Sequence, residues 1–470
     1  MITYQDFLKA GEEDTKRMVF CVDAVNSHKR SEIYETAVLA DEYYRKQNRT
    51  IVQFQKLLYT VSGQAVPDNY SSNFKLRKTF FNLFITQQNQ YLLSNGVAWE
   101  NDDTEEKLSN DRYEFDTQLQ EAGRLALIGG VSFGFFNFDH VDIFSITEFV
   151  PLYDEENGAL RAGIRFWQLD SAKPMRVTLY EEDGYTDYVY NEGKGEVLHP
   201  KRTYKQVVKY TPAGGEEVFD GENYPSFPIV PLWGNPEHQS EIIGLQEKID
   251  CYDLIESGFA NTVDEASLIY WTINNGGGMD DIDLAEFVKR IRTVHAAVVS
   301  DDGASATSHA IESPYESRER LLDRLRRDLF EDYMALDTKE IAASAATATQ
   351  IRAAYEPVDD KADKYEYCIL QFVNGILSLA GIEDNPTFTR SKIVNVQEDI
   401  MTILSAAEYL DEEYIVRKIL DTLGDGDLAD SVLERMQIGD YGRTRANVEN
   451  GTGEQGNGQE NSRAGTEDQG

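Results

Sequence analysis

The sequence predicts an α+β protein that is mainly helical. Two stretches, 242–259 and 321–336, carry apolar residues three and four apart, which is the spacing of one face of an α-helix. Across 131–210 the apolar residues instead alternate, as they do in half-buried β-strands. The chain has 470 residues, more than one hydrophobic core usually supports. We therefore expect several structural parts, of which the strand-rich part is one.

Helices are expected before the strand-rich part. Residues 3–48 and 73–94 have helical patterns, and the second pattern stops at Asn95-Gly96, where the glycine can end a helix. Residues 100–113 are acidic and polar, which predicts a loop, and 116–128 returns to a helical pattern. The sequence thus predicts three helical regions before the first strand.

Residues 131–210 are expected to form an antiparallel meander. Turn sequences at 154–158, 181–184 and 191–193 interrupt the alternating pattern. A proline-rich stretch follows, with Pro225, Pro228, Pro231 and Pro236. It predicts an extended connector that ends where the first long helical stretch begins.

The two long helical stretches flank an insert that is not helical in character, which predicts a projecting hairpin with a small α/β module at its tip. The insert has strand-like runs at 268–273 and 294–300, with a glycine-rich turn after the first. Such a hairpin cannot bury its apolar stripes alone and needs partners. The alternative is an ordinary helical hairpin inside one core. The stripes include Ile242, Leu245 and Ile249 in the first arm and Leu321, Leu325 and Leu329 in the second.

The last third of the chain is expected to be helical and then disordered. Residues 342–349 are almost entirely Ala, Ser and Thr, which suits a tight helix contact, a mobile loop or a close approach to another surface. A helix is expected over 350–380 with a kink at Pro357, and further helices over 394–433. Residues 441–470 have almost no large apolar side chain and are expected to be disordered.

The charge of the chain argues against a sequence-specific DNA reader. There are 83 acidic and 45 basic residues, a net charge of −38 spread along the chain. A DNA reader needs basic surface to neutralise phosphates. An acidic lining would instead let a duplex slide without being gripped. Charge that merely keeps a large protein soluble explains the same composition.

The cysteines and the hydropathy indicate a soluble protein of a reducing, cytoplasmic setting. Cys21, Cys251 and Cys368 are far apart and form no CxxC pair, so neither a disulfide framework nor a thiolate metal site is expected. The N-terminus lacks the pattern of a secretory signal, and the longest apolar stretch, 125–136, is too short to span a bilayer.

One motif suggests catalysis but lacks the required context. Gly-Val-Ser-Phe-Gly at 130–134 matches the nucleophile elbow of α/β-hydrolases, which needs a strand before the serine and a helix after it. Here the predicted order is reversed, so Ser132 is expected inside a strand. No catalytic, cofactor or metal site is predicted, and the protein is not expected to be an enzyme.

Four segments together resemble the portal proteins of tailed double-stranded DNA bacteriophages. The helix that ends in Tyr-Leu-Leu-Ser-Asn-Gly-Val at 91–97 is similar to a helix of that family, as is the helix–Gly-Gly–strand passage at 122–136. The segments 148–158 and 227–253 resemble the family's next strand region and its entry into the first stem helix. The resemblance covers roughly residues 30–400 with its parts in the family's order.

This resemblance implies a ring, commonly of twelve subunits, at one capsid vertex of the virion, assembled in the host cytoplasm. Double-stranded DNA would enter and leave through its channel without sequence-specific binding. The partners would be the terminase large subunit, a head-completion or adaptor protein, and the major capsid and scaffolding proteins, with no membrane. The implied parts are a wing (1–239 and 350–400), two stem helices (240–267 and 314–336), a clip (268–313), a tunnel loop (337–349), a crown (401–440) and a disordered tail (441–470).

The resemblance also implies roles for particular residues. In the stem, Ile242, Leu245, Ile249, Leu321, Leu325 and Leu329 would pack between subunits. The clip candidates for partner binding are Trp271, Asn274, Asn275, Asp280 and Asp281. The tunnel-loop candidates for weak contacts with DNA are Thr338, Lys339, Ser344, Thr347 and Thr349, for which plain helix packing is the alternative. For the whole protein, the alternatives are another oligomeric virion or adaptor protein without a channel, and a serine hydrolase.

Overall fold

A computed structural model describes residues 2–438, except 60–62, 69–70, 102, 171, 192–193, 211–215, 267–269, 275–304, 310–314, 340–347, 393–395, 408 and 424–425. It confirms a mixed α+β protein in which helices predominate. The chain divides into two compact units, Met1–Ser391 and Lys392–Gly470. The predicted boundary between wing and crown at 400/401 is therefore wrong, since it would cut helix α13 (Val396–Ser405) in two.

The chain begins with the predicted helices, which are α1 (Tyr4–Ala10), α2 (Asp14–His28), α3 (Glu32–Tyr44) and the short α4 (Arg49–Gln53). Side-chain caps fix two of their starts, because Thr3 accepts from the Asp6 N–H before α1 and Ser31 accepts from the Tyr34 N–H before α3. A small hairpin of β1 (Leu57–Tyr59) and β2 (Ala65–Pro67) follows.

The second helical region begins later than the sequence predicts. Helix α5 spans Phe80–Leu93, so the helical pattern at 73–79 was misleading. Gly96 does adopt a positive φ of 71° just after this helix. A short helix, α6 (Thr104–Leu108), lies where a loop was expected, and α7 (Phe115–Gly129) confirms the third region. Strand β3 (Val97–Ala98) pairs with β16 (Thr387–Phe388).

The meander predicted over 131–210 is confirmed over 149–202, which forms a five-stranded antiparallel sheet in the order β10-β9-β8-β7-β6; residues 131–145 belong to a different sheet. Three of its four connections fall at the predicted turns, and the connection between β7 and β8 was not predicted. Helices α1 and α2 cover this sheet and enclose a small core that includes Phe7, Cys21, Val25, Ile164 and Leu179. The strands are β6 (Phe149–Tyr153), β7 (Leu160–Trp167), β8 (Met175–Glu181), β9 (Gly184–Asn191) and β10 (Lys194–Arg202). Strands β11 (Lys205–Tyr210) and β12 (Glu216–Glu222) form a separate pair.

A three-stranded sheet, β13-β4-β5, lies in the larger core. It contains β4 (Val131–Asn137), β5 (His140–Ser145) and β13 (Ile229–Trp233). The proline-rich connector is thus not extended chain alone, because β13 forms within it and pairs antiparallel with β4. Pro231 is accommodated because β13 is an edge strand. Helices α5, α7 and α12 (Ala348–Ala380) contact one another or this sheet, and their core includes Phe81, Phe84, Phe133, Tyr365 and Phe372.

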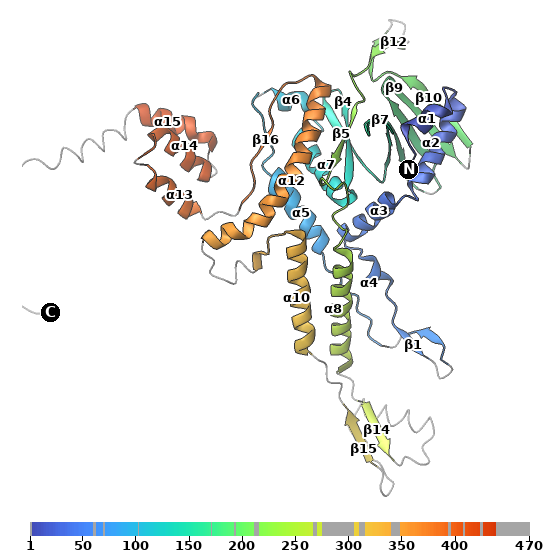
Figure 1. Cartoon of the computed structure of the whole chain (residues 1–470), viewed down its shortest axis with the longest axis vertical. Coiled ribbons are helices and arrows are strands. Elements are labelled where there is room, and N and C mark those ends of the chain that lie inside the picture. The colour runs from blue at the N-terminus through green and yellow to red at the C-terminus, as the bar shows by residue number, and fades with distance from the viewer. Residues whose placement is uncertain are drawn as a thin grey trace, which may run out of the picture. The chain divides into compact units, whose positions relative to one another are not determined.

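The two long helical stretches form α8 (Gln246–Ala266) and α10 (Tyr315–Tyr333), which lie side by side (Figure 1). The insert contains β14 (Tyr270–Asn274) paired antiparallel with β15 (Ser305–His309). The predicted second strand at 294–300 lies outside the described residues. Pro357 lies inside α12 as predicted, and Figure 1 shows a bend in this helix.

The second unit is helical, as expected for the end of the chain. After α13 come α14 (Glu412–Leu423), a 3₁₀ turn (Gly426–Leu428) and α15 (Ala429–Ile438). Helix α14 contacts both α13 and α15, and Ile415, Ala429 and Leu433 are buried. The predicted disordered tail, 441–470, lies outside the described residues.

Candidate functional site

Helices α8 and α10 form an antiparallel hairpin that is held at both ends. Near the start of α8, Lys248 forms an ion pair with Asp332 near the end of α10. Near the other end, Arg318 donates to Thr262 Oγ1 at 2.9 Å. Beside this contact, the ring of Tyr315 meets that of Phe259 edge-on, with centroids 5.4 Å apart. We call this hairpin the stem.

The base of the stem is buried in the larger core of its own subunit. Phe84 of α5 stacks on Tyr333 with ring centroids 4.6 Å apart, and Phe80 meets Tyr252 edge-on at 5.1 Å. Of the six residues predicted to pack between subunits, Ile242, Leu245, Ile249 and Leu329 are each at most 4% exposed within the subunit. For these four the prediction is wrong, because their apolar surface is already covered. Leu325 is half-buried and Leu321 is 43% exposed.

A partly buried ion pair joins the base of the stem to α12. Lys361 Nζ lies 2.6 Å from a carboxylate oxygen of Glu241 and also donates to the Tyr333 carbonyl at 3.1 Å. Burial lowers the pKa of Lys361, and the nearby Glu241 carboxylate opposes that shift. Because a lone charge here would be costly, the pair fixes the ends of α8 and α10 against α12.

The exit from α10 is also fixed. Met334 has a φ of 61°, and the Ala335 N–H bonds the Phe330 carbonyl at 2.9 Å, which ends the helix. The side-chain amide of Gln87 then both accepts from the Leu336 N–H and donates to the Leu336 carbonyl, each at 3.1 Å. Arg326 pairs with Asp337 at 2.7 Å. The chain therefore leaves the stem along a defined path.

The predicted tunnel-loop residues follow this anchored exit. Thr338 and Lys339 are exposed, and the Lys339 N–H donates to Asp337 Oδ1 at 3.0 Å. Ser344 and Thr347 lie outside the described residues. Thr349 belongs to α12, so the predicted loop end at 349 is wrong by two residues.

The predicted clip residues are only partly within the described chain. Trp271 and Asn274 lie on β14, in register with Ser308 and Ser305 of β15. Asn275, Asp280 and Asp281 lie outside the described residues. The strand that pairs with β14 is one the sequence reasoning missed, because its Ser-Ala-Thr-Ser-His sequence has little apolar character.

An extended segment, residues 72–78, runs along the side of α8 and was not anticipated. Its alternate backbone N–H groups donate to α8 side chains: Lys78 to Asp253 at 2.8 Å, Leu76 to Ser257 at 2.9 Å, and Phe74 to Asn261 at 2.7 Å. The Ser72 hydroxyl bonds Asp264. We call this set of contacts the polar ladder.

The polar ladder can form because the repeat of a helix over four residues nearly matches the repeat of an extended chain over two residues. Four residues of an α-helix rise about 6 Å, and two residues of extended chain span about 6.6 Å. Asp253, Ser257 and Asn261 are four apart and buried, which is an unusual pattern of polar side chains for a helix face. That pattern was the sequence signal available.

Asp253 is the most buried acid of the ladder. Its carboxylate is 0% exposed and also accepts from Asn48 Nδ2 at 2.5 Å. Burial raises the pKa of Asp253 to about 6, against the opposing effect of the hydrogen bonds from Asn48 and Lys78. Asn48 in turn donates to the Lys78 carbonyl at 3.0 Å, so three segments meet here.

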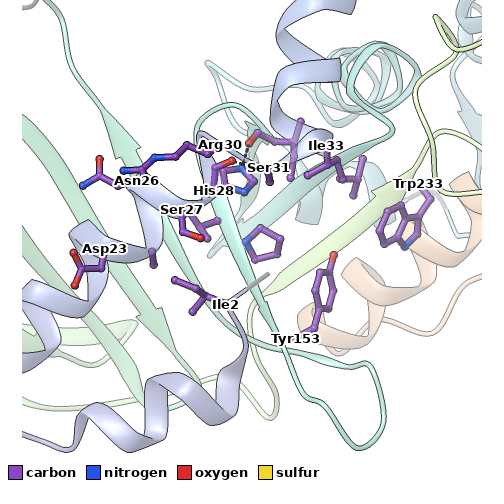
Figure 2. Close-up of a pocket in the computed structure, with 15 residues that line it drawn as sticks. Ile2, Asp23, Asn26, Ser27, His28, Arg30, Ser31, Ile33, Tyr153 and Trp233 are labelled. Atoms are coloured by element: carbon purple, nitrogen blue, oxygen red, sulfur yellow. Dashed lines mark hydrogen bonds between the residues drawn. The ribbon is translucent and has the colours of Figure 1, made fainter.

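A surface cavity of about 510 Å³ lies away from the stem (Figure 2). Its wall combines the end of α2 with β6 and Trp233 of β13. His28 hydrogen-bonds the Ile146 carbonyl at 2.8 Å, and the Ser31 hydroxyl donates to the His28 carbonyl at 2.6 Å. Burial lowers the pKa of His28. These hydrogen bonds join separate chain segments. The polar groups of the cavity wall therefore have a structural role.

The serine of the hydrolase-like motif has a structural role. Ser132 lies within β4, as the sequence predicts, is 0% exposed and donates to the Ala122 carbonyl at 2.8 Å. Gly130 has a φ of 87° at the end of α7, and a Cβ at Gly134 would lie 2.5 Å from the ring of Phe372. The three residues thus serve a turn, a hydrogen bond and a close packing contact. Within the described part of the chain, His, Cys, Asp and Glu residues form no group of three or more that could hold a metal ion.

The fold and the stem have a counterpart among known families. A family model described as phage portal protein, SPP1 Gp6-like, matches residues 24–430. This match runs from α2 through the stem to the second unit and covers most of the chain. The chain belongs to this family of phage portal proteins.

Individual relatives agree with this assignment. The portal protein of Bacillus phage SPP1 is 25% identical over 394 residues, covering 77% of this chain and 75% of that protein. A portal protein of Clostridium phage phiCD119 is 24% identical over 193 residues, covering 39% of this chain and 43% of that protein. A solved neck of a native GTA particle, computed with C12 symmetry, has a TM-score of 0.43 at 11% identity over 72% of this chain and 88% of the solved one. That last likeness is too distant to bear on how this chain assembles.

Among the described helices, none is both long and apolar enough to cross a membrane.

Proposed function

We propose that this chain is the subunit of a portal ring, twelve copies of which surround a channel at one capsid vertex. Double-stranded DNA would be packaged and later ejected through this channel without sequence-specific binding. The observation that carries the proposal is the family match, which includes both helices of the stem. The subunits would assemble in the host cytoplasm and remain in the virion.

The geometry of the stem supports a conduit. The base of the hairpin is fixed to the core by the Lys361–Glu241 pair, while Thr338 and Lys339 are exposed just after the Arg326–Asp337 pair. A loop that starts from a fixed point can be held at a constant distance from a passing duplex. Lys339 would supply one weak phosphate contact per subunit, and Ser344, Thr347 and Thr349 remain candidates for others.

Docking of partners is assigned to the insert between α8 and α10. The β14–β15 pair, with Trp271 and Asn274, would meet the terminase large subunit and later a head-completion or adaptor protein. Asn275, Asp280 and Asp281 remain candidates for the same contact. The wing, residues 1–239 and 350–400, would contact the major capsid and scaffolding proteins.

Electron microscopy of the purified full chain tests the ring. We expect rings with a central hole, and we expect them to be more populated at high ionic strength, because subunits with a net charge of −38 repel one another less when salt screens them. Solid particles without a hole would favour an adaptor without a channel. A compact monomer under all conditions would contradict the proposal.

A test of the conduit needs DNA movement. Rings assembled with the matching terminase and proheads should package DNA, and replacing Lys339 with Glu should slow packaging while leaving ring assembly unchanged. Replacement of Lys29, a lysine of the wing, with Glu is the matched control. Equal packaging rates for the two variants would remove Lys339 from the channel.

A further inference from the structure

The stem is a layer of three elements and not only a pair of helices. Helix α10 lies on one side of α8, as the Arg318–Thr262 contact shows, and the extended segment 72–78 lies on the other side through the polar ladder. In Figure 1, α10 and α4 appear on opposite sides of α8. A layer of this kind has two broad faces, and they differ in shape.

The first face carries protruding apolar side chains. Lys78 reaches Glu256 at 2.8 Å, which shows that the even-numbered side chains of the extended segment lie on the Glu256 side of α8. The odd-numbered ones point the other way, because side chains alternate along an extended chain. Lys75, for example, donates to the Val52 carbonyl. Phe74 and Leu76 therefore lie on the Glu256 side, and they are 50% and 39% exposed. We call this pair the knob.

The second face is recessed. Gly258 lies about half a turn around α8 from Glu256, and a Cβ added there would meet no atom within 4 Å. Leu254, one turn before Gly258, is half-buried. Leu321 of α10 lies on the opposite side of its helix from Phe330, which packs against Phe80 and so marks the covered side. We call Gly258, Leu254 and Leu321 the notch.

The knob and the notch lie at the same level of the stem. The Leu76 N–H bonds Ser257, the residue next to Gly258. The contacts of Arg318 with Thr262 and of Lys248 with Asp332 place Leu321 close to the level of Phe259. Both features therefore sit within about one helical turn of each other along α8.

We infer that the knob of one subunit packs into the notch of the next copy of this chain. A rotational ring repeats one heterologous contact between two different faces of the same subunit. Rotation about an axis along the stem keeps every residue at its own level, so only features at equal height on opposite faces can meet. The knob and the notch satisfy this condition. Without a neighbouring subunit, Leu321 stays exposed, Leu254 stays half-buried and the space beside Gly258 stays open.

This inference rests on the proposed ring and names one of its interfaces. It also returns Leu321 to an intersubunit role, while the four buried stem residues act inside the subunit. The notch depends on a small residue at 258, because a large side chain there would occupy the space that the knob needs.

Disulfide trapping tests the contact directly. Cys251 is exposed, whereas Cys21 and Cys368 are buried, so Cys251→Ser gives a suitable background. In that background, Leu76→Cys combined with Gly258→Cys should yield, after mild oxidation of assembled rings, a ladder of covalent multimers on a non-reducing gel. A bond inside one subunit would give no ladder. The control combines Leu8→Cys with Gly258→Cys. Leu8 is 56% exposed and lies on α1, not on the segment 72–78. This variant should run as a monomer on the same gel.

A second measurement does not depend on cysteine chemistry. Leu76→Asp keeps the backbone N–H that Ser257 accepts but places a charge on the knob. It should raise the subunit concentration needed for half-assembly by about tenfold or more, whereas Leu8→Asp should change it by less than about twofold. Rings that form normally yet give neither the covalent ladder nor this shift would overturn the knob and notch while leaving the portal ring intact. Failure of the unmodified chain to form any ring would overturn both.

Discussion

The two arms of the stem are stabilised in different ways. Helix α8 has buried residues along most of its length, from Ile249 to Asn261, because α10 lies on one side of it and the polar ladder on the other. Helix α10 is buried only at its end, at Leu329, Phe330 and Tyr333. Its first three turns are half-buried or exposed.

This difference shows which arm is structurally independent. Helix α8 is fixed by contacts within its own subunit, so its position is set before any assembly. Helix α10 is buried at its base, whereas its first three turns, which include Leu321 of the notch, contact α8 but stay half-buried or exposed. The comparison can be tested by removing the contacts of each arm in turn.

The largest effect is expected at the buried base of α10. Leu329→Ala should lower the free energy of unfolding by about 2–5 kcal/mol, because it leaves a cavity in the core. Leu321→Ala should lower it by less than about 1 kcal/mol, since that side chain is 43% exposed. Urea unfolding of dissociated subunits at one fixed concentration measures both. Equal losses would mean that α10 is covered along its whole length.

The next effect is a pH dependence at the centre of the polar ladder. The folded pKa of Asp253, about 6, exceeds the ordinary value of 3.8, so the folded state binds more protons between these values. The stabilisation that comes from the protonated Asp253 side chain is fully present below about pH 4 and is lost as the pH rises through about 6. Asp253→Asn cannot ionise. Relative to the unmodified chain, its free energy of unfolding should therefore improve by about 3 kcal/mol between pH 4 and pH 7. Urea unfolding over this range measures the difference, and a constant difference would contradict the prediction.

The smallest effect concerns a single rung of the ladder. Ser257→Ala leaves the Leu76 N–H without its partner, which should lower the free energy of unfolding by about 1–2 kcal/mol. Ser317→Ala, on the exposed part of α10, is the matched control and should change it by less than about 0.5 kcal/mol. Hydrogen exchange should also become faster at Leu76 in the first variant only. Unchanged exchange there would show that the ladder is not closed in solution.

Much of the fold could be predicted from local patterns. The alternation over 131–210 predicted the strands of the five-stranded sheet and three of its four turns, and the helical spacing predicted α7, α8 and α10. The extended segment 72–78 could not be predicted this way. Leu76, Phe80 and Phe84 are four apart, as on one face of a helix, but the N–H groups of 74 and 76 are bound by side chains more than 180 residues away. Strand β13 was hidden for a similar reason, because only its position at a sheet edge makes Pro231 acceptable.

The candidate site likewise has features that the sequence predicted and features that only the structure shows. The sequence predicted the two long helices and the non-helical insert between them, but it assigned Ile242, Leu245, Ile249 and Leu329 to contacts between subunits. The structure buries these four within one subunit. Gly258 carries no periodic signal and was not singled out, although its open side defines the notch.

By itself, the sequence determined that two long amphipathic helices exist and that each must cover an apolar stripe. Only the tertiary structure decided what covers each stripe. The physical reason is that periodicity specifies which side of a helix leaves water and contains no information about the surface that replaces the water. That surface is chosen by α5, by α12 and by the extended segment 72–78, all of them distant in sequence from α8 and α10.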